Sequence, residues 1–146
     1  MRVLLLVTAI WLLGTPEASN AAPRSLIPEG WREVTPSDSQ GGERVFESPD
    51  GEARLRLGHV MARSGNRDRL AHRDGETITY QRQGRSWLVV SGYRDGEIFY
   101  RKSNLACQGT RWHTIELQYP REAKERLDRV VASIARGMGA YASECG

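Results

Sequence analysis

Three histidines are the side chains in this sequence best suited to acid–base chemistry. His59, His72 and His113 are widely spaced, and no His-Glu-x-x-His or cysteine–histidine pattern surrounds them, so the sequence predicts no metal site. His59 lies at an inward position of a predicted strand, and His72 lies in a polar stretch. His113 alone has neighbours suited to a site, but no Gly-x-Ser-x-Gly motif provides a nucleophile. A small hydrolase with His113 as general base is therefore the alternative hypothesis.

The chain has two cysteines, Cys107 and Cys145. They form no Cys-x-x-Cys motif and Cys145 is the penultimate residue, which favours a structural role over a redox-active or nucleophilic one. An even number of cysteines in an exported chain is typical of disulfide bonding. The sequence therefore predicts a Cys107–Cys145 disulfide, worth about 4 kcal/mol in the chain-entropy description.

Residues 1–21 have the organisation of a secretory signal peptide. Arg2 provides the positive charge, residues 3–13 form a short apolar run, and Ser19 and Ala21 are small residues at the predicted cleavage site. The run is too short to span a bilayer, which needs about 20 apolar residues. We expect export to the periplasm or the medium, with residues 22–146 as one mature domain that does not insert into a membrane.

The charge pattern excludes some classes of partner. The chain has 21 Lys and Arg against 18 Asp and Glu, a net charge of +3, and the two signs are interleaved. A nucleic-acid-binding protein usually has a basic stripe with aromatic residues between its charges, which is absent here. The sequence has no glycine-rich phosphate loop before a helix, so no cofactor is predicted. The expected partners are an unidentified small molecule or another exported protein.

The pattern of apolar residues predicts strands followed by one long helix. Alternation is clearest over residues 53–61, and Asp95-Gly96 between two apolar runs is typical of a type I′ hairpin turn. Residues 66–72 fit a short helix or a loop equally well. A helix is expected from Pro120 to Arg136, ended by Gly137 and Gly139. The remaining strands are expected at residues 31–35, 43–48, 77–82, 87–93, 97–106 and 112–119. The predicted fold is α+β: an antiparallel meander packed by a C-terminal helix in a single domain.

Two short hairpin loops, Asp95-Gly96 and Gln108-Gly109, would fix the pairing of the last three strands. One face is then apolar at one end, where the last helix should dock. At its other end lie Trp87, Asn104 and His113 in one row, with Lys102 one step away on the diagonal. These four residues are the candidate ligand-binding site, in which the polar groups would bind an acid or an amide beside an apolar wall of Trp87. A solvated row beyond the helix end is the other interpretation. On the opposite face, Arg101 is predicted to pair with Glu116 and Ser103 with Thr114.

Two features resemble the opening of PsbP-like domains. They are Gly30-Trp31, and the segment Phe46-x-Ser48-Pro49-Asp50-Gly51 followed by an alternating strand. PsbP-like domains are small exported domains in which an antiparallel sheet closes with a C-terminal helix. The resemblance implies a non-catalytic binding or accessory module. A structural or inhibitory interaction domain that uses the loops at residues 37–42 and 63–76 is a further alternative.

Overall fold

The computed structural model describes residues 26–36, 39 and 42–145. The predicted signal peptide, residues 1–21, lies outside the described residues. So does most of the loop at residues 37–42 that was considered as a contact element.

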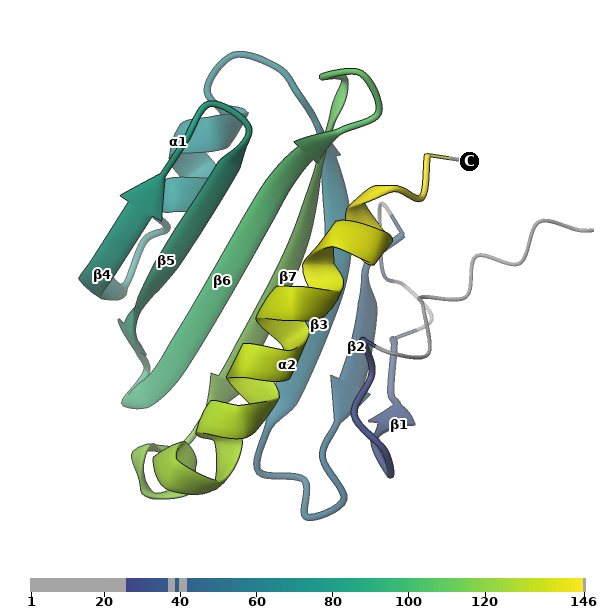
Figure 1. The fold of residues 1–146 in the computed structure, drawn as a ribbon. Helices are drawn as coiled ribbons and strands as arrows, with labels where there is room; N and C mark the ends of the chain where they lie inside the picture. Colours follow the sequence, from purple (N-terminus) through teal and green to yellow (C-terminus); the bar gives the residue numbers. More distant parts are fainter. Residues whose placement is uncertain (1–25, 37–38, 40–41, 146) are drawn as a thin grey trace, which may run out of the picture.

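The chain forms one seven-stranded antiparallel sheet in the order β1-β2-β3-β7-β6-β5-β4, with the long helix α2 lying diagonally across it (Figure 1). This confirms the predicted α+β class. The strands are β1 (Arg32–Glu33), β2 (Arg44–Glu47), β3 (Arg54–Met61), β4 (Glu76–Gln83), β5 (Trp87–Arg94), β6 (Glu97–Ala106) and β7 (Arg111–Tyr119). The helices are α1 (Asn66–Ala71), the 3-10 turn η1 (Arg121–Ala123) and α2 (Lys124–Ala142).

The hairpin turns set the register that the sequence predicts. Asp95 and Gly96 both have positive φ, 53° and 81°, as a type I′ turn requires. Asn104 consequently pairs with Trp87 on one side and with His113 on the other. The alternation of faces over β5, β6 and β7 is therefore as predicted.

Strand order departs from a single meander at β3. Strands β4 to β7 pair consecutively, but β3 pairs with β7 along its whole length, from Arg54 opposite Gln118 to Met61 opposite Arg111. The segment after β3, including α1, therefore runs behind the sheet from the β3 side to the far edge at β4 (Figure 1).

The end of the last helix was predicted wrongly. The expected stops, Gly137 and Gly139, lie inside α2, which continues to Ala142. Gly137 is the point of closest approach to the N-terminal segment, because a Cβ there would lie 3.0 Å from Leu26 Cδ1. The extra turn brings the buried Tyr141 over the sheet, and its hydroxyl donates to the Gly58 carbonyl at 3.1 Å. Among the described residues, no helix is long and apolar enough to cross a membrane.

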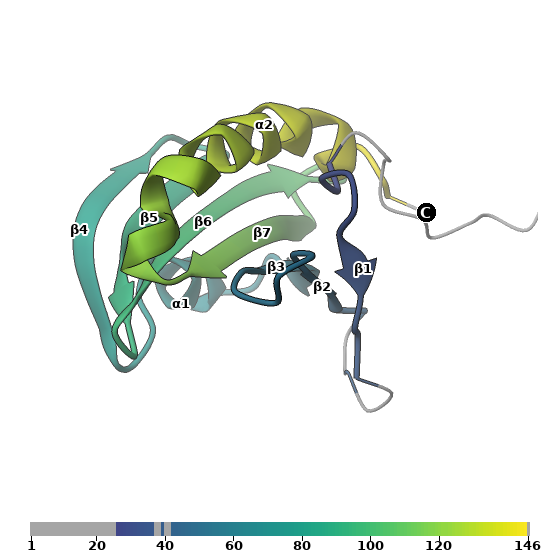
Figure 2. The same cartoon turned by 90° about the horizontal axis from the view of Figure 1, so that it is seen from below.

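Helices α2 and α1 cover opposite faces of the sheet (Figure 2). The larger core lies under α2, as predicted, where the helix stripe of Leu127, Ile134 and Met138 packs on apolar residues of β3 and β7. The smaller core lies under α1, where Leu70 covers four residues of the other face. These four are Leu88, Val90, Phe99 and Trp112.

A buried charge cluster adjoins the smaller core. Arg101 is fully buried and donates to both carboxylate oxygens of Glu76, at 2.7 and 2.8 Å, and to Glu116 at 3.0 Å. Its Nε donates to the Leu70 carbonyl at 2.7 Å. Arg94 bridges Glu76 and Glu116 from the side. We call Arg101, Glu76, Glu116, Arg94 and Arg73 the arginine–glutamate cluster.

Removing Arg101 is expected to destabilise the protein strongly. Arg101→Leu leaves two buried carboxylates without their central partner, a change that typically costs about 3–5 kcal/mol. Urea denaturation measures the loss. Arg126→Leu is the matched control, because Arg126 pairs with Asp50 and Glu52 on the exposed surface and its loss should barely move the midpoint. Equal effects of the two substitutions would contradict a structural role for the cluster.

Candidate functional site

A broad open hollow lies on the α2 face where β5, the β6–β7 hairpin and the end of α2 meet. Its volume is about 1120 Å³. Three of the four predicted site residues, Trp87, Lys102 and Asn104, line it. The other walls come from the hairpin turn and from Gly139, Ala142, Ser143 and Cys145 at the C-terminal end of the chain. We call this site the Trp87 hollow.

The polar side chains of the Trp87 hollow use only part of their hydrogen-bonding capacity. The Lys102 ammonium donates one hydrogen bond, at 3.0 Å, to the Ala135 carbonyl of α2, which orients the side chain along the helix. An ammonium carries three donors, so two stay available to a ligand. The Asn104 Oδ1 atom is buried and accepts no hydrogen bond from any described residue. An unsatisfied buried acceptor is costly, by about 1–3 kcal/mol, which favours a ligand that brings a donor to it.

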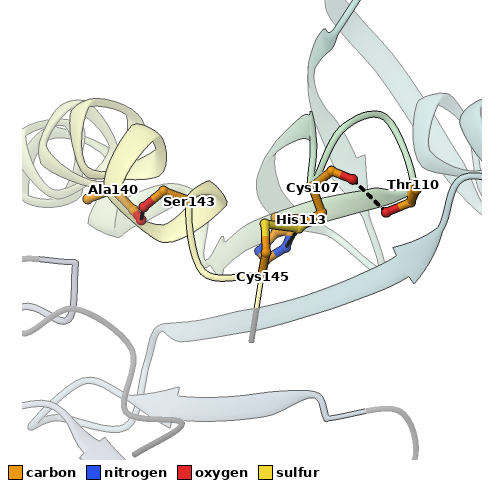
Figure 3. The surroundings of a disulfide bond; sticks show 6 residues. All are labelled: Cys107, Thr110, His113, Ala140, Ser143 and Cys145. Carbon is orange, nitrogen blue, oxygen red and sulfur yellow. Dashed lines mark hydrogen bonds between the residues drawn. A yellow bond between two sulfur atoms is a disulfide. The ribbon is translucent and has the colours of Figure 1, made fainter. Parts of the chain in front are cut away.

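His113 shares the row but does not line the hollow. It is 3% exposed, because the last turn of α2 and the disulfide cover β7 at this position. Its Nε2 lies 3.7 Å from Cys107 Sγ (Figure 3). Its ring meets the Tyr141 ring edge-on, with centroids 5.1 Å apart. The predicted four-residue site is therefore three residues at the surface of the hollow and one histidine beneath them.

The surroundings of His113 favour the neutral imidazole. Burial lowers its pKa below the ordinary 6.5, and the nearby His59 and Arg111 lower it further. Burial and Arg111 also lower the pKa of His59, whose ring centroid is 6.0 Å from that of His113. The Nδ1 atom of His113 has no hydrogen-bond partner among the described residues. No described serine or threonine is hydrogen-bonded to His113.

The disulfide forms one wall of the site and fixes the chain end. Cys107 and Cys145 are bonded, with their Cα atoms 5.5 Å apart, as the sequence predicts. Cys107 lies in the hairpin turn after β6, where its carbonyl accepts a hydrogen bond from the Thr110 hydroxyl at 2.7 Å (Figure 3). Ser143, at the end of α2, donates to the Ala140 carbonyl at 2.6 Å. The bond thus joins the helix end to the hairpin directly above His113.

The groups that line the Trp87 hollow are suited to binding a ligand. The hollow offers an exposed indole and a cation, and the unsatisfied amide oxygen of Asn104 is buried behind its wall. Among residues 26–36, 39 and 42–145 no group of three or more His, Cys, Asp or Glu side chains could hold a metal ion.

Sequence reasoning missed a second group of polar residues, the arginine–glutamate cluster. It predicted the Arg101–Glu116 and Ser103–Thr114 pairs, which the structure has at 3.0 and 3.1 Å, but as ordinary cross-strand pairs. The available signal was the position of these two pairs. They share a sheet face with Leu88, Phe99 and other large apolar residues, which predicts that another part of the chain covers this face. The segment at residues 63–76 provides that cover and supplies Glu76.

Comparison with known proteins supports the fold. A scan against protein-family models and a search of curated proteins both find no match. Among solved structures, the chain is similar to the solution structure of cyanobacterial PsbP (CyanoP) from Synechocystis sp. PCC 6803. The TM-score is 0.52 at 13% identity, covering 86% of this chain and 96% of that one. The chain therefore has a PsbP-like α+β fold, in agreement with the predicted resemblance.

Breaking the disulfide is expected to lower stability and to loosen the wall of the Trp87 hollow. Cys145→Ser frees the chain end, and the loop-closure model gives a loss of about 4 kcal/mol, measurable by urea denaturation. Cys107→Ser and the double variant should lose the same amount, because each removes the same bond. Mass spectrometry after alkylation without reductant should find neither cysteine labelled. Labelled thiols in the intact protein would refute the bond.

Stability should fall as the pH drops from 7.5 to 5.5. The folded-state pKa values of His113 and His59 lie below 6.5, so in this window the unfolded chain binds protons first and acid favours unfolding. Each unit of pKa lowering corresponds to about 1.4 kcal/mol. His113→Gln should flatten the decline, whereas His72→Gln, at an exposed position, should keep it. An unchanged slope in His113→Gln would show that His113 titrates normally.

Proposed function

We propose that this chain is an exported, non-catalytic binding module that recognises an amide group attached to a flat apolar group, in the Trp87 hollow. The observation that carries the proposal is a cation with spare donors, Lys102, at the wall of a hollow that Trp87 and Asn104 also line, with the unsatisfied Asn104 Oδ1 atom buried behind that wall. An amide has both a carbonyl acceptor and at least one N–H donor, so it can satisfy both groups together.

The polar contacts assign the orientation of the ligand. Its carbonyl oxygen would accept from the Lys102 ammonium, whose position the Ala135 carbonyl fixes. Its N–H would donate to Asn104 Oδ1, which is buried in the free protein and would have to turn toward the ligand. A carboxylate would bind Lys102 more strongly through a charged hydrogen bond, but it would place its negative charge against Asn104 Oδ1 and bring that acceptor no donor, so the site should prefer the amide.

The apolar contacts define the rest of the ligand. The indole of Trp87 is 39% exposed and lies beside Val89 and Leu105 in the wall of the hollow. A flat ring stacked on an exposed indole removes apolar surface of both partners from water. The hollow is open and wide, which suits one end of a larger molecule, such as an amidated aromatic group on a peptide or a cell-surface component.

Three features taken together support the proposed export. Residues 1–21 read as a signal peptide, the two cysteines are paired, and PsbP-like domains are the type of small exported domain that the chain resembles. A periplasmic or secreted location would present the hollow to ligands outside the cytoplasm. The proposed role is that of an accessory module that binds and delivers or senses its ligand.

Benzamide is the smallest probe of the proposed site. In a ¹H–¹⁵N NMR titration of the oxidised protein, benzamide should shift the Trp87 indole and Asn104 signals saturably, with a Kd in the millimolar range. Benzoate should bind more weakly, because it brings no N–H donor to Asn104. Trp87→Ala should reduce the affinity for benzamide by about tenfold.

Two variants distinguish the proposed contacts from nonspecific binding. Asn104→Leu should remove the preference for benzamide over benzoate while leaving some binding to both. Tyr80→Ala is the matched control, because Tyr80 is also an exposed aromatic residue, 49% accessible, but does not line the hollow. Binding that Tyr80→Ala weakens as much as Trp87→Ala, or no saturable shift at all, would overturn the proposal.

A further inference from the structure

A second hollow lies on the opposite face of the sheet, between β3, β7 and the segment that carries α1. Its volume is about 480 Å³. Arg56 of β3 and Arg73 of the α1–β4 segment line it, with Glu116 of β7 between them and Glu43 also in the lining. We call it the Arg56 hollow. It shares no lining residue with the Trp87 hollow and is independent of the function proposed above.

The charges around the Arg56 hollow do not balance. Glu116 is paired with four arginines: Arg56, Arg73, Arg94 and Arg101. The second buried carboxylate of the arginine–glutamate cluster, Glu76, is shared by Arg94 and Arg101. Four guanidinium groups therefore surround two carboxylates, which leaves an excess of positive charge facing the hollow even beside the exposed Glu43.

The pKa shifts within the arginine–glutamate cluster agree with this excess of positive charge. Burial lowers the pKa of Arg73, and the like charges of Arg101 and Arg94 act in the same direction, against the attraction of Glu116 and Glu76. For Glu116, burial alone would raise the pKa, but the surrounding arginines outweigh it and the pKa is lowered. The carboxylate is thus held ionised by more positive charge than it neutralises.

Two of the arginines keep donors directed at the hollow. Arg73 uses only Nη1 in a hydrogen bond, to Glu116 at 2.9 Å. Arg56 approaches Glu116 no closer than 3.7 Å, beyond hydrogen-bond distance, and its guanidinium has no hydrogen bond to a described residue. The side chain of Arg56 is 34% exposed and that of Arg73 is 41% exposed, so a ligand can reach both.

We propose that the Arg56 hollow binds the oxyanion group, phosphate or carboxylate, of a small molecule, held between the guanidinium groups of Arg56 and Arg73. Guanidinium groups present paired N–H donors that match either oxyanion, and such charged hydrogen bonds are stronger than neutral ones. Gly58 faces the hollow between Glu43 and Thr114, and the absence of a side chain there leaves room above the strand. The buried cluster behind holds the two arginines in place.

Inorganic phosphate and acetate, titrated separately, test the site and distinguish the two oxyanions. The measurement is ¹H–¹⁵N NMR of the backbone at Gly58 and Thr114, with ionic strength held constant by sodium chloride. One of the two anions should give a saturable shift. Arg56→Gln should weaken that binding by about tenfold, as expected for a lost charged contact. Glu43→Gln should strengthen it by about threefold, because it removes a like charge.

Matched variants distinguish a specific anion-binding site from nonspecific binding of anions to a basic surface. Arg54→Gln removes an arginine from the same face of β3, one that pairs with Glu47 away from the hollow, and should leave anion binding unchanged. Gly58→Val keeps every charge but fills the space, and should abolish binding. Unfolding midpoints establish that each variant is folded. Non-saturable shifts for both anions, or equal losses in Arg54→Gln and Arg56→Gln, would overturn the proposal. Benzamide binding in the Trp87 hollow would be unaffected by either result.

Discussion

The structure depends on the burial of one positive charge, that of Arg101. A fully buried guanidinium is tolerated only when carboxylates and carbonyls satisfy it, because desolvation of an unpaired charge costs more than a small domain can offset. Glu116 lies opposite on the neighbouring strand, but Glu76 and the Leu70 carbonyl come from the segment that crosses behind the sheet. Satisfying Arg101 therefore fixes where α1 lies and where β4 begins, and so places the far edge of the sheet.

The opposite face is organised by different means. There the long helix packs an apolar stripe on β3, β6 and β7, and the disulfide fastens its last turn to the β6–β7 hairpin. The hollow beside Trp87 exists because α2 lies over β6 and β7 and leaves β5 uncovered at that end. The same last turn that shapes the hollow covers His113, so the helix end decides which members of the polar row meet solvent and which are buried.

Local sequence signals were sufficient for the register of the last three strands and for the apolar stripe of α2, but not for the strand order or for what covers the opposite face. Asp95-Gly96 and the alternation of β6 and β7 determine the register, and thus the row of Trp87, Asn104 and His113. The helix end was wrong because Gly137 is a tertiary contact with Leu26, which no local rule for glycine detects. The burial of His113 and the role of Glu76 follow from contacts between residues far apart in the chain. Such partners cannot be inferred before the strand order is known, and β3 beside β7 was not predicted.

The two faces consequently offer different chemistry on one scaffold. Similarity to cyanobacterial PsbP extends over nearly the whole of that chain at only 13% identity, so sequences that differ at most positions reach this fold. An apolar set of similar volume could fill the space of the arginine–glutamate cluster and often would be at least as stable. Glu116 of this cluster also contacts Arg56 and Arg73, and the spare donors of these two arginines at the Arg56 hollow agree with the anion binding proposed above.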